Sequence, residues 1–188
     1  MANWIAQRNE LLGKAVIANL AKRNMEGYYC ATKEEALQKA LELIPETDVV
    51  TWGGSVSIDE IGLLAAVKER NPVIDRDTAA TMEEKVEMMR KGLTCDTFLM
   101  STNAMSEDGI LVNIDGNGNR VASLIFGPKQ VVIIAGVNKI TKDLDSAIAR
   151  ARGTAAPVNA QRFAGIRVPC AATGVCSNCN SPDCMCCQ

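Results

Sequence analysis

Asp48-Val49-Val50-Thr51-Trp52-Gly53-Gly54-Ser55 is the stretch that decides the fold of this chain. Its apolar and β-branched start predicts a buried strand, and the two glycines end that strand. Ser57 and Glu60 then stand three residues apart, in the form of a capping box, so a helix is expected to run to about Arg70. A strand, a Gly-rich turn and a helix in this order form a βα unit, which predicts the α/β class.

The same alternation continues on both sides of this unit. The apolar spacing of the first 25 residues predicts an amphipathic helix, and Thr32 with Glu35 has the form of a second capping box that opens a helix through Leu43. Further strands are expected at 72–74, 94–101 and 131–135, and further helices at 81–91, 143–152 and 157–163. Two apolar runs around the turn-rich 116–119 predict a β-hairpin within 110–128. We expect one α/β domain over 1–167 and a separate tail over 168–188.

Composition narrows the classes of function. The chain has 188 residues, enough for one well-packed domain, and its 20 Lys and Arg nearly balance its 22 Asp and Glu. The sequence has no long run of charges of one sign that would indicate a surface for nucleic acid or anionic lipid, so neither partner is expected. The N-terminus lacks the pattern of a signal peptide, and no apolar stretch approaches the roughly 20 residues that span a bilayer, so we expect a soluble, cytoplasmic protein. The absence of histidine excludes Ser-His-Asp and Cys-His catalysis and any His-ligated zinc.

Cysteine is concentrated at the C-terminus, where six of the eight cysteines fall in the last 19 residues. Cys176 and Cys179 form a Cys-x-x-Cys pair, and Cys170 and Cys186 can approach from the flanks to complete four thiolate ligands. Four thiolates suit an iron–sulfur cluster or structural zinc, with free thiols or a disulfide as the remaining alternative. The pattern therefore predicts a metal centre without naming its metal.

Two groups of polar residues are candidates for a binding site. Gly53, Gly54 and Ser55 lie between a strand and a helix, where a phosphate or carboxylate could approach the backbone, although a glycine pair after a strand is more often only a tight turn. Other polar residues occur near the ends of apolar runs, where the pockets of α/β proteins lie. Each of them could equally be a residue that only stabilises a turn. In this second group Glu107 or Asp108 could act as a general base, and Lys139 could bind an anion. The remaining candidates are Asn103, Asn113, Asp115, Asn119 and Arg120.

Taken together, these motifs resemble the lactate-utilisation (LUD) domain family. The resemblance runs over nearly the whole chain from about Asn9, through the stretches 52–55, 60–62, 101–104, 107–109, 111–116, 118–122, 126–128, 136–139, 156–157 and the cysteine tail. It implies a fold similar to the sugar-phosphate isomerase and coenzyme A transferase-like group, a three-layer α/β/α open sheet that is mainly parallel. The resemblance also implies Cys170, Cys176, Cys179 and Cys186 as metal ligands. The pocket candidates that it implies are Gly53, Gly54, Ser55, Asn103, Glu107, Asn113, Asp115, Asn119 and Arg120. Cys184 departs from the family pattern, in which a basic residue is usual, and Cys187 is an extra, so either could replace Cys186.

Three functions follow as hypotheses. The first is a redox accessory or subunit in lactate or other 2-hydroxy-acid oxidation, with an iron–sulfur cluster, [4Fe–4S] in particular, in the tail and an iron–sulfur or other redox protein as partner. The second is a hydrolase, transferase or isomerase in which Glu107 is base or nucleophile and zinc or nothing occupies the tail. The third is a metabolite-binding module with structural zinc. In each, a small anionic metabolite is the expected ligand, and the amphipathic first helix leaves a homo-oligomer open.

Overall fold

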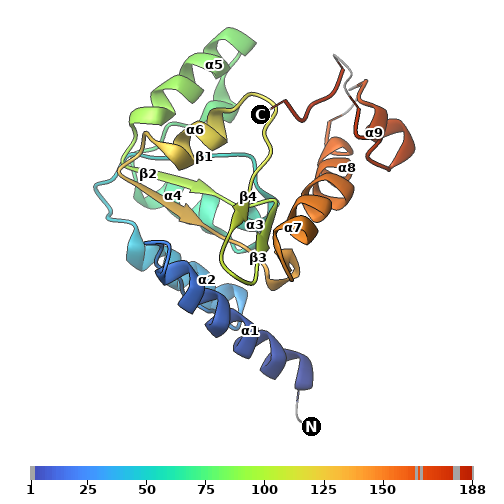
Figure 1. The fold of residues 1–188 in the computed structure, drawn as a ribbon. Coiled ribbons are helices and arrows are strands. Elements are labelled where there is room, and N and C mark those ends of the chain that lie inside the picture. The colour runs from blue at the N-terminus through green and yellow to red at the C-terminus, as the bar shows by residue number, and fades with distance from the viewer. Residues whose placement is uncertain (1–2, 164, 166, 180–182, 188) are drawn as a thin grey trace. The chain divides into compact units, whose positions relative to one another are not determined.

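The computed structural model describes residues 3–163, 165, 167–179 and 183–187 of the chain (Figure 1). They form two compact units, each assembled from separate stretches of sequence. Unit 1 comprises Met1–Gly27, Thr102–Gly118 and Gly136–Gln188, and unit 2 comprises Tyr28–Ser101 and Asn119–Ala135. The boundary expected near Arg167 stays a prediction.

Unit 2 is built on a parallel sheet. Its order is β1 (Val50–Trp52), β2 (Thr97–Met100) and β5 (Gln130–Ile133), with Val50 beside Thr97 and Thr97 beside Gln130. Val73 adds an isolated parallel bridge to Val50 on the outer side of β1. The predicted α/β class with a mainly parallel, open sheet is therefore confirmed.

Helices cover both faces of this sheet because alternate side chains of each strand point to opposite sides. Trp52, Leu99 and Val132 lie in register on one face and pack in a buried cluster with residues of three helices, α2 (Lys33–Leu43), α3 (Val56–Glu60) and α4 (Leu63–Arg70). Phe98 and Met100 face the other way, where Leu124 of α6 (Asn119–Ile125) packs near them. Unit 2 therefore has the three layers that the family resemblance implied.

Local signals explain most of the helix ends in unit 2. Thr32 and Thr81 accept hydrogen bonds from the backbone N–H of Glu35 and Glu84 at 3.1 and 3.2 Å, and at α5 (Met82–Lys91) the full capping box forms. The box expected at Ser57 does not form. The helix begins after Ser55 instead, and Gly62, in the left-handed conformation at φ +77°, separates α3 from α4.

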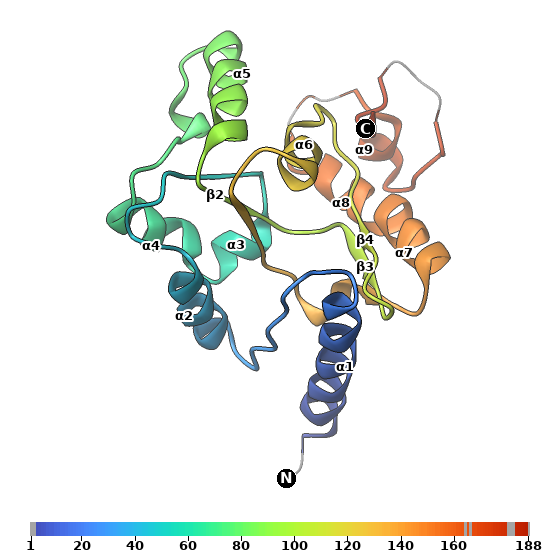
Figure 2. The same ribbon diagram turned by 60° about the vertical axis from the view of Figure 1, so that its left-hand side comes forward.

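Unit 1 holds α1 (Trp4–Ala21) and a small mixed sheet. In that sheet β3 (Ala104–Ser106) pairs antiparallel with β4 (Leu111–Val112) and parallel with β6 (Ile140–Thr141). Ala104 packs in a buried cluster with Ala147 of α7 (Leu144–Arg150), so the helix covers this sheet (Figure 2). The chain continues through a π-helical turn (Ala151–Ala155), α8 (Ala156–Ala160) and α9 (Pro169–Thr173).

The β-hairpin exists, but not where the sequence pattern put it. Its strands are β3 and β4, joined by the turn 107–110. Residues 120–128 were expected as the second strand, but 120–125 lie in helix α6. Leu124 packs into the core of unit 2 while Ile125 and Phe126 are exposed, so tertiary packing of one side of a short helix overrides the β-branched pattern of this run.

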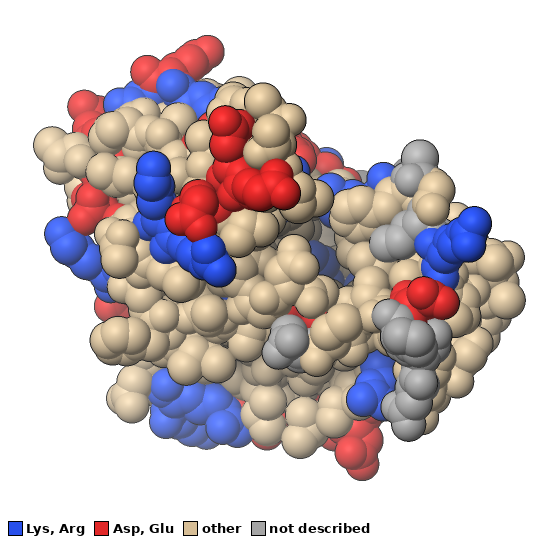
Figure 3. All heavy atoms as spheres, turned by 90° about the horizontal axis from the view of Figure 1, so that it is seen from above, with Lys and Arg blue, Asp and Glu red and all other residues tan. Residues whose placement is uncertain are grey.

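The predicted amphipathic helix is confirmed as α1, but little of it is buried. Gly13 and Val16 are its buried residues, whereas the side chains of Trp4, Ile5 and Leu11 are exposed. No helix in the described ranges is long and apolar enough to cross a membrane. On the face drawn in Figure 3, basic and acidic side chains lie in small interleaved groups, as the balanced composition leads one to expect.

Candidate functional site

The glycine turn, residues 53–55, directly follows β1 at the carboxyl edge of the parallel sheet. The Gly53 N–H donates to the carbonyl of Leu99 at 2.9 Å, which ties the start of the turn to β2. A Cβ at Gly53 would lie 3.0 Å from Cδ of Arg120, and a Cβ at Gly54 would lie 3.2 Å from Nη2 of Arg76. The missing side chains of the two glycines therefore leave room for two arginines.

Both arginines reach the turn because the sheet is parallel. Arg120 lies in the first turn of α6 and donates from Nη1 to the carbonyl of Ser101, just beyond β2, at 2.9 Å. Arg76 follows Val73, which runs parallel to β1. Parallel segments end at the same edge of a sheet, so residues distant in sequence meet there, where ligands of open α/β sheets bind.

Buried polar atoms beside the two arginines lack partners. Ser55 is only 8% exposed, and within the part of the chain that is described its hydroxyl has no hydrogen-bond partner. The Trp52 indole N–H is also buried and has no hydrogen-bond partner among the described residues. A buried polar group without a partner costs stability, and such groups often mark a place where a ligand or water binds.

The charges around Trp52 are largely paired. Lys68 lies 5.1 Å from the centroid of the Trp52 ring and forms an ion pair of 2.6 Å with Asp75. Asp77 pairs with Lys85 at 3.2 Å. Burial alone would raise the pKa of Asp77, but Lys85, Arg76 and the Trp52 indole outweigh it and hold that pKa below its ordinary value. The Trp52 N–H thus lies near Asp77 and lowers its pKa, although the two groups do not form a hydrogen bond of good geometry.

Sequence reasoning found the glycine turn and Arg120 but missed Arg76. No motif marks Arg76, which lies more than twenty positions from Gly53. The available signal was the strand expected at 72–74, because its parallel pairing with β1 carries the following residues to the same edge.

The two candidate catalytic carboxylates lie in the hairpin turn of unit 1. Glu107 forms an ion pair of 2.7 Å with Lys142, and its backbone carbonyl accepts from Asn19 of α1. Asp108 pairs with Arg23 at 3.2 Å, and its carboxylate also accepts a hydrogen bond from Ser106. These contacts hold the turn in place, so the geometry explains both carboxylates without catalysis, and their acid–base role stays a prediction.

The remaining polar candidates divide between the two units. Asn103 in unit 1 accepts a hydrogen bond from the Ile114 N–H at 2.9 Å. Asp115 is buried, and its carbonyl accepts from the Cys187 N–H at 3.0 Å. Asn119 begins α6 in unit 2, where its carbonyl accepts from Ser123 at 2.9 Å. Asn113 directly follows β4, and Lys139 ends a 3₁₀ turn before β6, both in unit 1.

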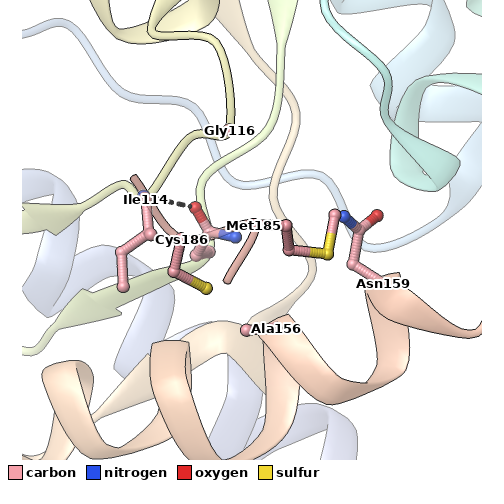
Figure 4. Close-up of a pocket in the computed structure, with 7 residues that line it drawn as sticks. Ile114, Gly116, Ala156, Asn159, Met185 and Cys186 are labelled. Carbon is pink, nitrogen blue, oxygen red and sulfur yellow. Dashed lines mark hydrogen bonds between the residues drawn. The ribbon is translucent and has the colours of Figure 1, made fainter. Parts of the chain in front are cut away.

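A small pocket of unit 1 lies beside the cysteine-rich segment (Figure 4). Its volume is about 40 Å³, enough for a few water molecules and too small for a metabolite. A Cβ at Gly116 would lie 3.2 Å from the carbonyl of Met185, so this glycine permits the close approach of the segment. The residues that line the pocket are Asn103, Ile114, Gly116, Ala156, Asn159, Met185 and Cys186.

Five thiols of the C-terminal segment lie near one another. Burial first, and then the nearby thiols of Cys184, Cys170 and Cys176, raise the pKa of Cys186 to about 11. The Cys186 backbone and the Cys179 thiol lower the pKa of Cys184, and Arg152 contributes. Cys187 differs from these five because it is exposed and its thiol donates to the Cys184 carbonyl at 3.1 Å. Cys184 therefore lies among the other thiols, and which cysteines serve as ligands stays a prediction.

Comparison with known families settles the family. A family model described as LUD domain matches residues 13–188. The chain belongs to the LUD domain family. Comparison with curated proteins and with solved structures finds no match. The family membership connects this LUD domain to lactate utilisation, and the match includes the cysteine-rich segment.

The cysteines of this LUD domain are suitable metal ligands by their chemistry, but their side chains do not converge on one point in the described residues. Thiolates are the preferred ligands of iron–sulfur clusters and of structural zinc, and five of them influence one another here. In the described ranges, however, no three Cys, Asp or Glu side chains converge closely enough to hold a metal ion. Mutual effects on pKa need only nearness, whereas coordination needs convergence to about 2.3 Å from one ion, so the sulfurs must draw together to bind.

Proposed function

We propose that this LUD domain protein is a redox accessory or subunit in the oxidation of lactate or a related 2-hydroxy acid. In this proposal the glycine turn holds the anionic group of the metabolite, and the cysteine-rich segment carries a metal centre. Family membership supports the link to lactate utilisation.

The observation that carries the binding site is the meeting of two arginines on one glycine turn. Arg120 packs on Gly53 and Arg76 on Gly54, and the two glycines are chain neighbours whose Cα atoms lie about 3.8 Å apart. Arginine is the residue best suited to a carboxylate or phosphate because its planar fork offers parallel N–H donors. Both arginines are partly exposed, so an anion can reach them from solvent.

The roles of the residues follow from their surroundings. Arg120 is held by the Ser101 carbonyl and would orient the anion, while the Ser55 hydroxyl would donate to one of its oxygens. Trp52, packed under Lys68, forms an apolar floor at the start of the turn. No described side chain at this turn serves as an evident base, which suits a subunit or binding protein better than a complete enzyme.

For the metal centre we propose Cys170, Cys176, Cys179 and Cys186 as ligands, with Cys184 as the alternative to Cys186. An iron–sulfur cluster bound there would supply one-electron transfer. Cys170 is buried in a small apolar cluster with Ala160 and Val168, which would give any bound metal a rigid anchor.

That buried anchor also favours a second candidate function. Structural zinc uses the same thiolates and needs no redox partner, so a metabolite-binding module with a zinc-stabilised C-terminus fits the donors equally well. The ion pair between Glu107 and Lys142 gives no comparable support to a hydrolase, transferase or isomerase based on Glu107.

Metal analysis separates the candidates. We expect protein purified without oxygen to be brown, with iron and sulfide in proportion, and we expect a Cys176→Ser, Cys179→Ser double variant to lose the colour. Cys30→Ser, outside the segment, is the matched control and should keep the colour. A colourless protein with one zinc would favour the binding module, and a protein with neither metal would overturn the metal centre.

Anion binding is tested separately by titration calorimetry with lactate and with inorganic phosphate. We expect saturable binding of at least one of them to the wild-type protein and clear weakening in Arg120→Gln. Binding that Arg120→Gln leaves unchanged would remove the glycine turn from the proposal.

A further inference from the structure

Arg152 connects the helical segment of unit 1, residues 144–160, to the first pair of candidate metal ligands. Its guanidinium donates from Nη1 to the side-chain oxygen of Asn178 at 2.8 Å, and Asn178 lies between Cys176 and Cys179. We propose that Arg152 positions the cysteine loop, residues 176–179, so that its two thiolates can bind one metal centre. The inference rests on the proposed metal centre, and it assigns Arg152 to that centre as a positioning residue.

The shape of the cysteine loop depends on the backbone at Asn178. The φ angle of Asn178 is +47°, in the left-handed region that residues other than glycine seldom adopt, although asparagine does so more readily than most. In this conformation the Asn178 N–H donates to Cys176 Sγ at 3.4 Å. A hydrogen bond to a metal ligand orients that ligand, so the N–H helps to fix the direction of the sulfur. The contact from Arg152 therefore holds the residue on which the loop depends.

Arg152 lies in the π-helical turn, and the packing of the helical segment explains that turn. Four buried alanines follow one another at steps of four, five and four residues, namely Ala147, Ala151, Ala156 and Ala160. At the step of five the Ala156 N–H donates to the Ala151 carbonyl, which is the hydrogen bond of a π-helix. The extra residue keeps the buried alanines on one side of the segment. Arg152, which directly follows a buried alanine, is exposed and available to the cysteine loop.

The same helical segment also supports the other candidate ligands. Ala160 packs against Cys170 in a buried cluster, and Gln161, directly after α8, donates to the Cys170 carbonyl at 3.4 Å. Ala156 lines the small pocket beside Cys186 (Figure 4). One element therefore supports all three parts of the ligand set. Because the sulfurs must draw together around a metal, a common support limits how far each of them has to move.

The test measures the affinity of the reduced, metal-free full chain for Zn²⁺, by competition with a chromogenic chelator. Zn²⁺ is a suitable probe because thiolates bind it whether the resident metal is zinc or iron. We expect Arg152→Gln to weaken Zn²⁺ binding roughly tenfold to hundredfold, the usual effect of removing a residue that orients a metal ligand. Arg152→Lys can still donate one hydrogen bond and should recover part of the affinity. The matched control is Arg8→Gln, because Arg8 is an exposed arginine of α1 that donates to the side chain of Asn9 at 3.2 Å; it should bind Zn²⁺ as the wild type does.

A double-mutant cycle separates positioning from a general effect on the fold. Asn178→Gly removes the acceptor of the Arg152 hydrogen bond and keeps the left-handed backbone, which glycine adopts freely. If Arg152 acts through Asn178, Arg152→Gln should weaken Zn²⁺ binding much less in the Asn178→Gly protein than in the wild type. Urea unfolding of the metal-free variants checks that each of them folds. If Arg152→Gln is unstable, Arg152→Lys takes its place in the cycle.

The outcomes distinguish this inference from the function on which it rests. The role of Arg152 would be overturned, and the metal centre left standing, if Arg152→Gln binds Zn²⁺ within about twofold of the wild type. An equally large effect of Arg152→Gln in the Asn178→Gly protein would have the same meaning. Failure of the wild type to bind Zn²⁺, or undiminished binding by the Cys176→Ser, Cys179→Ser double variant, would overturn both the proposed ligands and the role of Arg152.

Discussion

Gly53→Ala tests the geometry of the glycine turn with the smallest change that the chain offers. The new Cβ would lie 3.0 Å from Cδ and 3.2 Å from Cγ of Arg120. Carbon atoms attract best at about 3.5–4.0 Å, so the Arg120 side chain must move by about 0.5–1 Å. That shift strains the 2.9 Å hydrogen bond to the Ser101 carbonyl and displaces the guanidinium from the turn.

The expected result is weaker anion binding in a folded protein. Loss of one charge-assisted hydrogen bond to the anion costs about 1.5–3 kcal/mol, which is roughly a tenfold to hundredfold rise in Kd. Stability should change by less than about 1 kcal/mol, because a flexible side chain can give way and alanine lowers the entropy of the unfolded chain. Calorimetry with inorganic phosphate measures the first quantity and urea unfolding the second.

The matched control is Gly153→Ala, where the new Cβ would meet no atom within 4 Å. It should leave the affinity unchanged and slightly raise stability, because Gly153 lies in a helical turn. If Gly53→Ala binds phosphate within about twofold of the wild type, the packing of Arg120 on Gly53 does not shape the anion site. A loss of several kcal/mol in stability would show instead that the turn is a structural element first.

Three further predictions concern stability. Gly109→Ala should lower the free energy of unfolding by about 2–3 kcal/mol, because a side chain at φ +85° is strained and its Cβ would lie 3.1 Å from the backbone of α1; a neutral result in urea unfolding would argue against that close contact. Thr81→Ala should cost about 1 kcal/mol through loss of the α5 capping box, with Thr78→Ala as a nearby comparison outside the box. Burial, followed by Asp96, raises the pKa of Cys95 from 9.0 to about 11, so its proton is held more tightly in the folded protein. This contribution to stability is complete below pH 9 and is lost as the pH rises to about 11. The free energy of unfolding of Cys95→Ala should therefore fall less between these two pH values than that of the wild type, by at most roughly 2–3 kcal/mol. An equal fall in both proteins would contradict the raised pKa.

The parts of the fold that sequence reasoning found are those set by local interactions. The capping residues Thr32 and Thr81 act on backbone groups three positions away, so the sequence alone reveals them. The core strands could be predicted because buried strands need continuous apolar runs. The strand predicted from residue 120 was wrong, because the environment of this run depends on a sheet face built from strands before and after it.

The candidate site divides in the same way. The sequence by itself determined the LUD family, the glycine turn and the thiolate donors, because each depends on the identity of residues that are close along the chain. Only the tertiary structure decided that Arg76 meets the turn beside Arg120, since parallel pairing of Val73 with β1 brings the two arginines to one edge of the sheet. Likewise, the spacing of the cysteines indicated that they could be metal ligands. The nearness of Cys184 to Cys179 and Cys186, however, depends on how the cysteine-rich segment packs on the rest of unit 1. Contacts between residues distant in sequence depend on packing of the whole unit, which no local pattern encodes.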